Sequence, residues 1–254
     1  MSLYDYPRYY DLVYGSDWKA EVDFLTGVFE RYVRGTTKRL LEPACGTGRL
    51  MFRLEREGYQ VDGIDLNPNA VEYCNQRLLR HGMQGTARVA DMTDFTVKSK
   101  YCAAFNTINS FRHLEKHSQA LNHLSCMAKA IRRGGVYILG LHLCPRFGEP
   151  VEEESWIARR GHLCVQTSMW LVERNLRKRF ERFHMRYDIW TPTDHKTLDD
   201  EFNFRTYTRQ QFDKLLSEIP EFEIEATYDF SYELERPIEV DDHSEDVVYI
   251  LKRV

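Results

Sequence analysis

Apolar positions along the chain follow two different periodicities. From about residue 17 to residue 142, short apolar runs alternate with stretches in which apolar residues recur every three or four positions. The runs predict strands at 39–42, 59–65, 86–89, 101–108 and 136–142, and the spaced stretches predict helices at 17–33, 48–57, 69–80 and 119–133. Strands separated by helices favour right-handed crossovers and an open, mostly parallel sheet.

A period of two replaces this pattern after residue 142. Within residues 143–206, apolar and polar residues alternate over 163–171 and 183–189, which is typical of antiparallel strands with two unlike faces. A helix at 209–219, capped by Thr208, and strands at 221–230 and 246–251 follow. We therefore expect one α/β domain over 1–254, with a Rossmann-like seven-stranded, mostly parallel sheet, helices on both faces, and an antiparallel β insertion at 143–206 after the fifth strand.

A glycine-containing turn joins the first predicted strand to the next helix. The strand ends at Glu42, small residues follow, and Gly46 and Gly48 would let a ligand approach the backbone closely. The N-terminus of the following helix offers free N–H groups to a polar ligand. A plain strand-to-helix turn also favours glycine, so this turn alone does not establish a binding site.

Two acidic residues at strand ends strengthen the case for a ligand. Asp65 ends the second strand, 19 positions after Gly46, and Asp91 follows the third strand, so both lie at the edge of the sheet where ligands bind. The dinucleotide pattern GxGxxG lacks its third glycine here, and Glu42 would repel a pyrophosphate. A cationic ligand that carries a ribose, such as S-adenosylmethionine (SAM), suits these acids better.

With these residues the chain resembles the class I SAM-dependent methyltransferases. The segment EPACGTG at 42–48 is similar to their motif I, Asp65 to the ribose-binding acid of motif II, and 90–92 to the adenine-contacting motif III. Residues 104–114 are similar to motif IV. One departure is Ala44, which stands where many members have a glycine.

The resemblance implies S-adenosyl-L-methionine as the cofactor. Asp65 would accept hydrogen bonds from both ribose hydroxyls, and Asp91 would bind the adenine amino group with Met92 against the ring. Tyr14 would close over the carboxylate or sulfonium, or would simply be a packed tyrosine. The full set of cofactor-binding residues that the resemblance implies is Tyr14, Glu42, Ala44, Cys45, Gly46, Gly48, Asp65, Leu66, Asp91, Met92 and Asn109.

Motif IV also bears on the methyl acceptor. The sequence Asn109-Ser-Phe-Arg-His113 lacks the Pro-Pro pair of DNA methyltransferases and is similar to the Ser-x-x-His-Leu turn of small-molecule N-methyltransferases, including amino-sugar N,N-dimethyltransferases. The resemblance implies an enzyme that methylates a small molecule, at an amine nitrogen, by in-line displacement. His113 would be its general base or orient its substrate, or would be only a surface or capping histidine. His142, at the end of the fifth strand, would contact substrate or bond a loop.

The insertion at 143–206 allows several interpretations. Related families use such a segment as a lid over the substrate and for dimerisation, whereas the alternative is a longer sheet packed on itself. Within it, residues 174–186 carry six Lys or Arg against Glu181, a net charge of +5. This run would bind a phosphate-bearing substrate or RNA, or would be a solvated hairpin balanced by the acidic stretch 233–246. An RNA or protein methyltransferase, or a non-catalytic SAM-binding module, are the alternative functions.

Composition limits the classes of protein and of binding partner that remain. With 35 basic and 39 acidic residues the net charge is −4, which argues against a dedicated DNA-binding protein, so a nucleic-acid partner is not favoured. No apolar run approaches a membrane span, and the N-terminus has no signal-peptide pattern. Six cysteines stand singly, and neither they nor the histidines have metal-ligand spacing, so we expect no metal, no membrane partner and a cytoplasmic protein.

Overall fold

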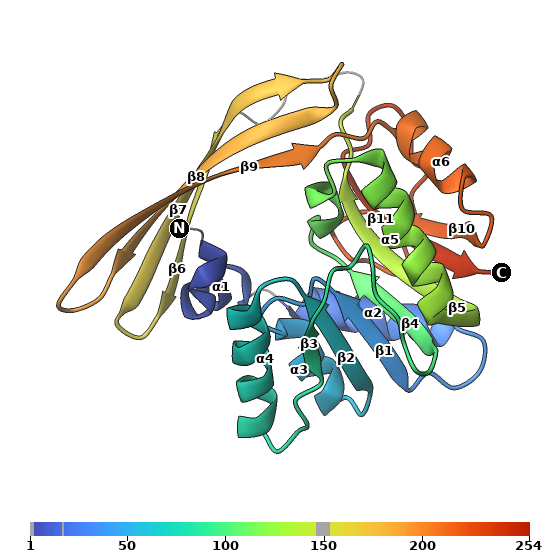
Figure 1. Cartoon of the computed structure of the whole chain (residues 1–254), viewed down its shortest axis with the longest axis horizontal. Helices are drawn as coiled ribbons and strands as arrows, with labels where there is room; N and C mark the ends of the chain where they lie inside the picture. Colours follow the sequence, from blue (N-terminus) through green and yellow to red (C-terminus); the bar gives the residue numbers. More distant parts are fainter. Residues whose placement is uncertain (1–2, 17, 146–152) are drawn as a thin grey trace.

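The computed structural model of the chain describes residues 3–16, 18–145 and 153–254. Its larger sheet has seven strands in the order β10-β11-β5-β4-β1-β2-β3 (Figure 1). The strands β1 to β5 run parallel, whereas β11 is antiparallel to β5 and β10 is antiparallel to β11. This confirms the predicted fold class. The strands are β1 (Arg39–Pro43), β2 (Gln60–Asp65), β3 (Ala87–Val89), β4 (Tyr101–Asn106), β5 (Ile131–His142), β10 (Phe222–Tyr228) and β11 (Asp246–Arg253).

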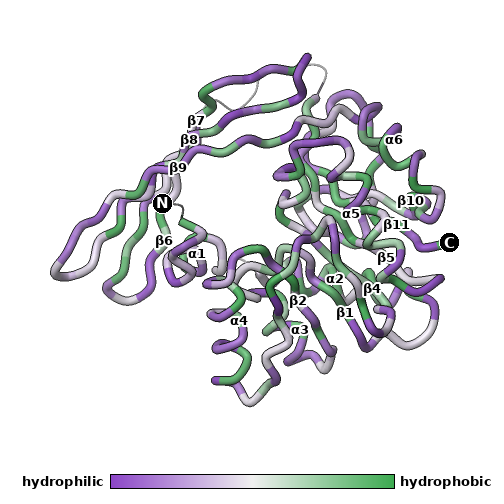
Figure 2. Tube along the Cα trace, viewed as in Figure 1, coloured by the Kyte–Doolittle hydropathy of each residue, from purple (hydrophilic) through white to green (hydrophobic). Residues whose placement is uncertain are grey.

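Helices cover both faces of this sheet, as predicted. One face packs against α2 (Lys19–Tyr32), α3 (Arg49–Arg56) and α4 (Pro68–Arg80). The other face packs against α5 (His117–Ala130) and α6 (Arg209–Ser217). Because the central strands are covered on both sides, β5 is buried continuously over residues 135–141. Figure 2 shows these hydrophobic stretches running through the strands between the helices.

Local capping explains where two helices begin. The Asn67 side chain accepts the backbone N–H groups of Asn69 at 2.9 Å and Ala70 at 3.2 Å, and Pro68 occupies the first turn of α4. The Thr208 hydroxyl accepts the N–H of Gln211 at 3.3 Å and caps α6, as the sequence predicted. At both caps the backbone of the N-cap residue is extended, so the helix begins at the residue that follows it.

The prediction of a helix over 119–133 was wrong at both ends. The helix α5 spans His117–Ala130, and residues 131–133 already belong to β5. The register between β5 and β4 shifts between the residues paired with Tyr101 and with Ala103. Gly134 lies within this shift and adopts φ +78°. Ile131 is extended and already pairs with Tyr101 of β4, so pairing with β4 begins directly after the helix, and a Cβ at Gly135 would lie 2.4 Å from the carbonyl oxygen of Cys102.

The insertion forms a second, antiparallel sheet of four strands, which we call the meander. The sequence prediction named strands only over 163–171 and 183–189. The meander comprises β6 (Glu153–Arg160), β7 (Leu163–Asn175), β8 (Phe180–Trp190) and β9 (His195–Arg205), paired in that order. The outer strands β6 and β9 were missed because they are largely exposed and lack clean alternation; only Leu198 of β9 is buried.

A short N-terminal helix also escaped prediction. The segment α1 (Pro7–Tyr14), preceded by the turn η1 (Leu3–Asp5), packs its Leu12 and Val13 against Val165 and Tyr187 of the meander. Its amphipathic pattern is carried largely by tyrosines, which are not strong helix formers. Residue 17, where the predicted helix 17–33 began, lies outside the described residues, and α2 runs from Lys19 to Tyr32. Figure 1 shows α1 beneath the meander, which arches away from the large sheet.

No helix in the described part of the chain is long and apolar enough to cross a membrane.

Candidate functional site

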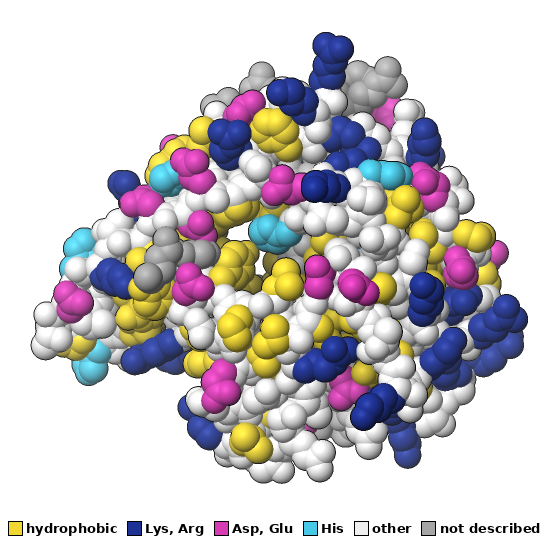
Figure 3. Space-filling model, viewed as in Figure 1, with side chains coloured by type: hydrophobic (Ala, Val, Ile, Leu, Met, Phe, Trp, Pro, Cys, Tyr) yellow, Lys and Arg dark blue, Asp and Glu magenta, His cyan; other side chains and the backbone are white. Residues whose placement is uncertain are grey.

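A cavity of about 740 Å³ lies between the carboxyl edge of the large sheet and the meander. Its wall includes Asp65 from the sheet, Tyr10 from α1, and Trp156, Phe183 and Phe202 from the meander. The volume lies within the range of roughly 300–1,000 Å³ that is usual for small-molecule sites. Figure 3 shows the hollow between the two parts, with hydrophobic side chains in its wall.

The turn after β1 has an unusual backbone that shapes one end of this cavity. Ala44, Gly46 and Gly48 all adopt left-handed conformations, with φ of 54°, 51° and 67°. A Cβ at Gly48 would lie 2.3 Å from the sulfur of Cys74, so only glycine fits there. The turn carries Gly46 to the cavity wall with its backbone N–H pointing at Asp65.

The Asp65 carboxylate is held rigidly at the end of β2. One oxygen accepts the N–H of Gly46 and the other accepts the N–H of Asn67, each at 2.8 Å. Burial raises the pKa of this carboxyl above its usual value, and these amides counteract part of that effect. Each carboxylate oxygen has a second lone pair, so the group can still accept hydrogen bonds from a ligand.

The acids beside this turn lie in different environments. Glu42 is buried, its Oε2 has no hydrogen-bond partner, and burial raises its pKa well above the usual value. Asp91 is exposed and accepts the N–H of Thr93 at 2.7 Å. Neither side chain lines the cavity, whereas the neighbouring Met92 does.

The predicted site residues are thus brought together only in part. Those that line the cavity are Tyr14, Ala44, Gly46, Asp65, Leu66, Met92, Asn109 and His113. Those that do not line it are Glu42, Cys45, Gly48 and Asp91. Glu42, Cys45 and Gly48 belong to the strand end and turn that support Gly46.

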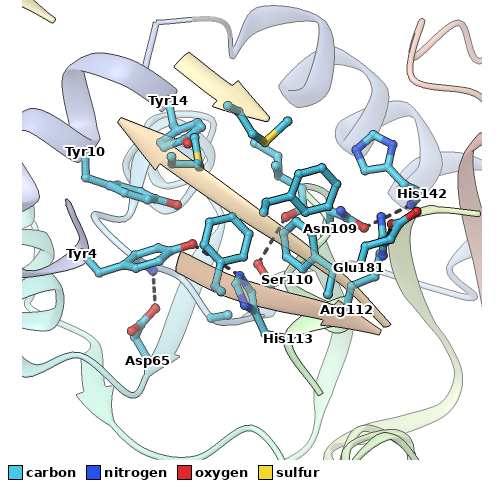
Figure 4. Close-up of a pocket in the computed structure, with 18 of the residues that line it drawn as sticks. Tyr4, Tyr10, Tyr14, Asp65, Asn109, Ser110, Arg112, His113, His142 and Glu181 are labelled. Carbon is cyan, nitrogen blue, oxygen red and sulfur yellow. Dashed lines mark hydrogen bonds and ion pairs between the residues drawn. The ribbon is translucent and has the colours of Figure 1, made fainter. Parts of the chain in front are cut away.

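Three tyrosines of the N-terminal segment form a row along the cavity. The ring centroids of Tyr4 and Tyr10 are 5.3 Å apart, those of Tyr10 and Tyr14 are 4.8 Å apart, and Trp156 of β6 follows at 6.3 Å from Tyr14. Figure 4 shows this row, with Asp65 at the end where Tyr4 lies. Only Tyr14 was predicted as a site residue, although the density of tyrosines over 4–14 was a signal that would have found the others.

A buried carboxylate fixes α1 to the elements around it. Asp11 forms ion pairs with Arg77 of α4 and, at 3.0 Å, with Arg160 of β6, and it accepts the Thr47 hydroxyl at 3.2 Å. Burial alone would raise the pKa of Asp11, but the two arginines hold it below the usual value. Asp11 therefore connects the tyrosine row, the turn after β1 and the meander.

His113 lies midway along the cavity, at the end of the turn η2 (Ser110–His113). Its Nε2 is 3.3 Å from the Tyr4 hydroxyl, and its ring centroid is 4.7 Å from that of Phe204. Burial, aided by the adjacent Arg112, lowers the pKa of His113 to about 4, and Asp200 opposes this shift. The imidazole is therefore neutral near pH 7 and is poorly suited to take up a proton in this state.

A charged cluster that the sequence did not predict lies at the other end. Glu181 of β8 pairs with Arg112 of η2 and, at 3.1 Å, with Arg174 of β7, and all three line the cavity. Arg112 also donates to the carbonyl of Arg205 at 2.9 Å. Figure 4 shows Arg112, Glu181 and His142 grouped away from Asp65, with His113 between the two ends.

The basic run 174–186 is paired in part with acids of the meander. Besides the pair with Glu181, Arg182 pairs with Glu173 at 3.2 Å and Arg186 with Asp199 at 2.9 Å. Acids that pair with the run therefore include Glu173 and Asp199 of the meander, which the sequence interpretation did not name. They were not foreseen because pairing across strands depends on register, which the run alone does not reveal.

Among the described residues, no three His, Cys, Asp or Glu side chains are arranged to hold a metal ion.

Comparison with known proteins identifies the domain that carries the turn and the acids. Residues 40–135 match the family model described as a methyltransferase domain, which confirms the resemblance over this segment. The chain is 26% identical over 141 residues to the dTDP-3-amino-3,4,6-trideoxy-alpha-D-glucopyranose N,N-dimethyltransferase of Streptomyces venezuelae. That match covers 53% of this chain and 56% of the relative, so the chain spans little more than half the relative's length.

Solved structures share the fold over nearly the whole chain. A SAM-dependent methyltransferase from Clostridium acetobutylicum superposes with a TM-score of 0.80 at 16% identity, covering 98% of this chain and 97% of the other. The SAM-bound amino pentose methyltransferase CalS10 from Micromonospora echinaspora gives a TM-score of 0.75 at 17% identity, covering 98% and 96%. The large sheet and its helices therefore have the class I methyltransferase fold, and the shared architecture with these two structures extends over the meander.

Proposed function

We propose that this chain is a SAM-dependent methyltransferase that methylates an amine nitrogen of a small molecule. The observation that carries the proposal is the Asp65 carboxylate, pinned by the backbone of the left-handed turn at the wall of a large cavity. The match of residues 40–135 to a methyltransferase domain supports the methyltransferase part of this proposal from sequence.

The residues at the Asp65 end fit the proposed cofactor. Asp65 would accept hydrogen bonds from the ribose hydroxyls. The adenine would lie against Met92 and would cover Leu66, which is 67% exposed. Glu42, at the base of the turn, does not line the cavity and contributes by supporting the backbone of Gly46. When bound, SAM supplies an electrophilic methyl group that is already activated for displacement.

The chain's own contribution to such a reaction is alignment and enclosure. The tyrosine row and the meander surround the cavity, so a cofactor and an acceptor would be held together away from bulk water. Holding two reactants in line contributes up to about 7–11 kcal/mol to the barrier reduction. Aromatic faces such as those of Tyr10 and Trp156 also favour a cationic centre nearby.

An amine acceptor is supported by the names of the relatives and by the charge of the cavity. The Streptomyces relative is named for an amino-sugar nucleotide, and CalS10 for an amino pentose. The end of the cavity opposite Asp65 carries more carboxylates than arginines, which favours an acceptor that arrives as an ammonium cation. The lining residues there are Arg112, His142, Glu154, Arg174, Glu181, Glu245 and Asp246.

Calorimetric titration with S-adenosylhomocysteine tests the cofactor assignment. Asp65→Asn should weaken binding at least about 10-fold, since a hydrogen bond to a charged group contributes about 1.5–3 kcal/mol. Asp62→Asn is the matched control, because Asp62 lies on the same strand but pairs with Arg39 at 2.9 Å outside the cavity. Equal affinities of the two variants would contradict the assignment.

Mass spectrometry tests the acceptor class. Incubation with SAM and a panel of small amines, including the 3-amino sugar nucleotide named for the relative, should yield products with one or two added methyl groups. Hydroxyl analogues of the same compounds serve as controls and should remain unmodified. Methylation of the hydroxyl analogues alone would contradict nitrogen as the acceptor atom.

The basic run does not favour an RNA acceptor. Arg174, Arg182 and Arg186 are engaged by carboxylates of the meander, which leaves less positive charge for a phosphate backbone. A gel shift with RNA at low salt should therefore show no salt-dependent binding.

A further inference from the structure

A second histidine lines the cavity and has what His113 lacks, a carboxylate partner. His142 ends β5, and its Nδ1 is 2.5 Å from Oδ1 of Asp246, the first residue of β11. The two residues face each other in the antiparallel register of these strands. Both line the cavity, and the His142 side chain is 35% exposed while that of Asp246 is 48% exposed.

The surrounding structure orients this pair. The backbone N–H of His142 donates to Oδ1 of Asn109 at 3.1 Å, which ties the end of β5 to the loop before η2. The His142 ring packs edge-on against Phe230, with centroids 4.9 Å apart. A carboxylate on Nδ1 holds the proton on that nitrogen, so Nε2 is left as a hydrogen-bond acceptor.

A neutral histidine of this kind can assist the methylation of an ammonium acceptor. A protonated amine has no lone pair for attack, so a base must first remove a proton. His113 is neutral but buried among aromatic rings next to Arg112, which disfavours a second positive charge at that place. At the His142 end, Asp246 and Glu245 supply the negative charge that a transient imidazolium needs.

We propose that His142, oriented by Asp246, is the general base that deprotonates the acceptor amine; this rests on the proposed function. The N–H proton passes to Nε2 of His142. The freed nitrogen lone pair then forms the bond to the methyl carbon, the carbon–sulfur bond breaks, and its electron pair stays on sulfur. His113 keeps a positioning role through its contact with the Tyr4 hydroxyl.

The charged groups around this pair are consistent with the role. Asp246 and Glu245 approach from the start of β11, and the Arg112–Glu181 pair lies at the same end of the cavity. Glu181 is shared by Arg112 and Arg174, so these three side chains leave one net positive charge against the two acids next to His142, Asp246 and Glu245. An ammonium acceptor would therefore enter a locally negative pocket.

Single-turnover methyl transfer to the 3-amino sugar nucleotide, with saturating SAM, tests the proposal. At pH 7, His142→Gln should lower the rate by about 10²–10⁴-fold, the usual contribution of a general base. Raising the pH should restore much of the rate, since the amine then loses its proton to solvent. Asp246→Asn should lower the rate about 10–100-fold, as loss of an orienting carboxylate usually does.

His195→Gln is the matched control. His195 also pairs with a carboxylate, with its Nε2 3.2 Å from Asp188, but neither residue lines the cavity. The methyl-transfer rate of the His195→Gln variant should equal that of the wild type. A rate for His142→Gln within threefold of the wild type at pH 7 would overturn the proposal, whereas retained S-adenosylhomocysteine affinity in all variants shows that the cofactor site is intact.

A spectroscopic readout does not depend on the acceptor. In the complex with S-adenosylhomocysteine, the ¹⁵N shifts of His142 should show a protonated Nδ1 and an unprotonated Nε2, and Asp246→Asn should abolish this preference. A proton on Nε2 in the wild type would overturn the proposal even if no amine were methylated. Failure of the proposed function itself would appear separately, as an absence of S-adenosylhomocysteine binding.

Discussion

A buried carboxylate, Glu181, is one of the links between the meander and the elements of the large sheet. The side chains of Glu181 and Arg112 are 7% and 6% exposed, and Arg174, the second partner of Glu181, is 20% exposed. Glu181→Gln would keep the shape of the side chain and remove its charge. Arg112 would then be a buried cation without a counter-charge, which is the costly way to break a buried pair.

The expected loss is large for a single substitution. Removing one partner of a buried ion pair costs about 3–5 kcal/mol, against a total stability of roughly 5–15 kcal/mol for a typical domain. For a chain of this size about 1 kcal/mol corresponds to 2–4 °C in Tm, so Tm should fall by about 6–20 °C. The more exposed Arg174 adds less than about 1 kcal/mol to this figure.

Scanning calorimetry, combined with amide hydrogen exchange, measures both the size and the place of the effect. Exchange should accelerate first in β7 and β8, where the meander loses its connection to η2. Glu173→Gln is the matched control, because its pair with Arg182 is exposed and should contribute less than about 1 kcal/mol. Replacing both Glu181 and Arg112 by methionine should recover most of the loss, since no buried charge remains unpaired.

The reasoning is refuted if Glu181→Gln lowers Tm no more than Glu173→Gln does. It is also refuted if the double methionine variant is less stable than Glu181→Gln alone, because the cost would then not come from an uncompensated charge.

Two further outcomes follow from the backbone and from the buried histidines. Ala44→Gly should raise the free energy of unfolding by up to about 1 kcal/mol. A left-handed alanine costs about 1–2 kcal/mol, and the extra freedom of glycine in the unfolded chain offsets part of the gain. Urea denaturation measures this free energy, and a loss of stability would contradict this view of the turn. The pKa values of His113 and His123 are both lowered to about 4, mainly by burial. In this pH range the unfolded chain binds protons at these histidines that the folded chain does not bind, so stability should fall as pH is lowered from about 6.5 to about 4. Denaturation at several pH values checks this, and His113→Gln should make the fall in stability shallower.

Much of the fold followed from local patterns. Periodicity separated the α/β part from the antiparallel insertion, and Thr208 marked a helix start that the structure retains. The turn after Glu42 and the acid at Asp65 indicated a ligand site, because their spacing places both at the carboxyl edge of a parallel sheet. These features depend on neighbours a few residues away, so the order of residues is enough to recognise them.

The remaining features depend on partners that are distant along the chain. His142 and Asp246 are 104 residues apart, and Arg112 and Glu181 are 69 apart. They meet because β11 inserts beside β5 and because the meander folds back over η2, and neither event leaves a periodic trace. A hydrophobic pattern records which face of an element is buried, whereas the register between elements determines which side chains meet, and here that register places the acids of the cavity opposite their bases.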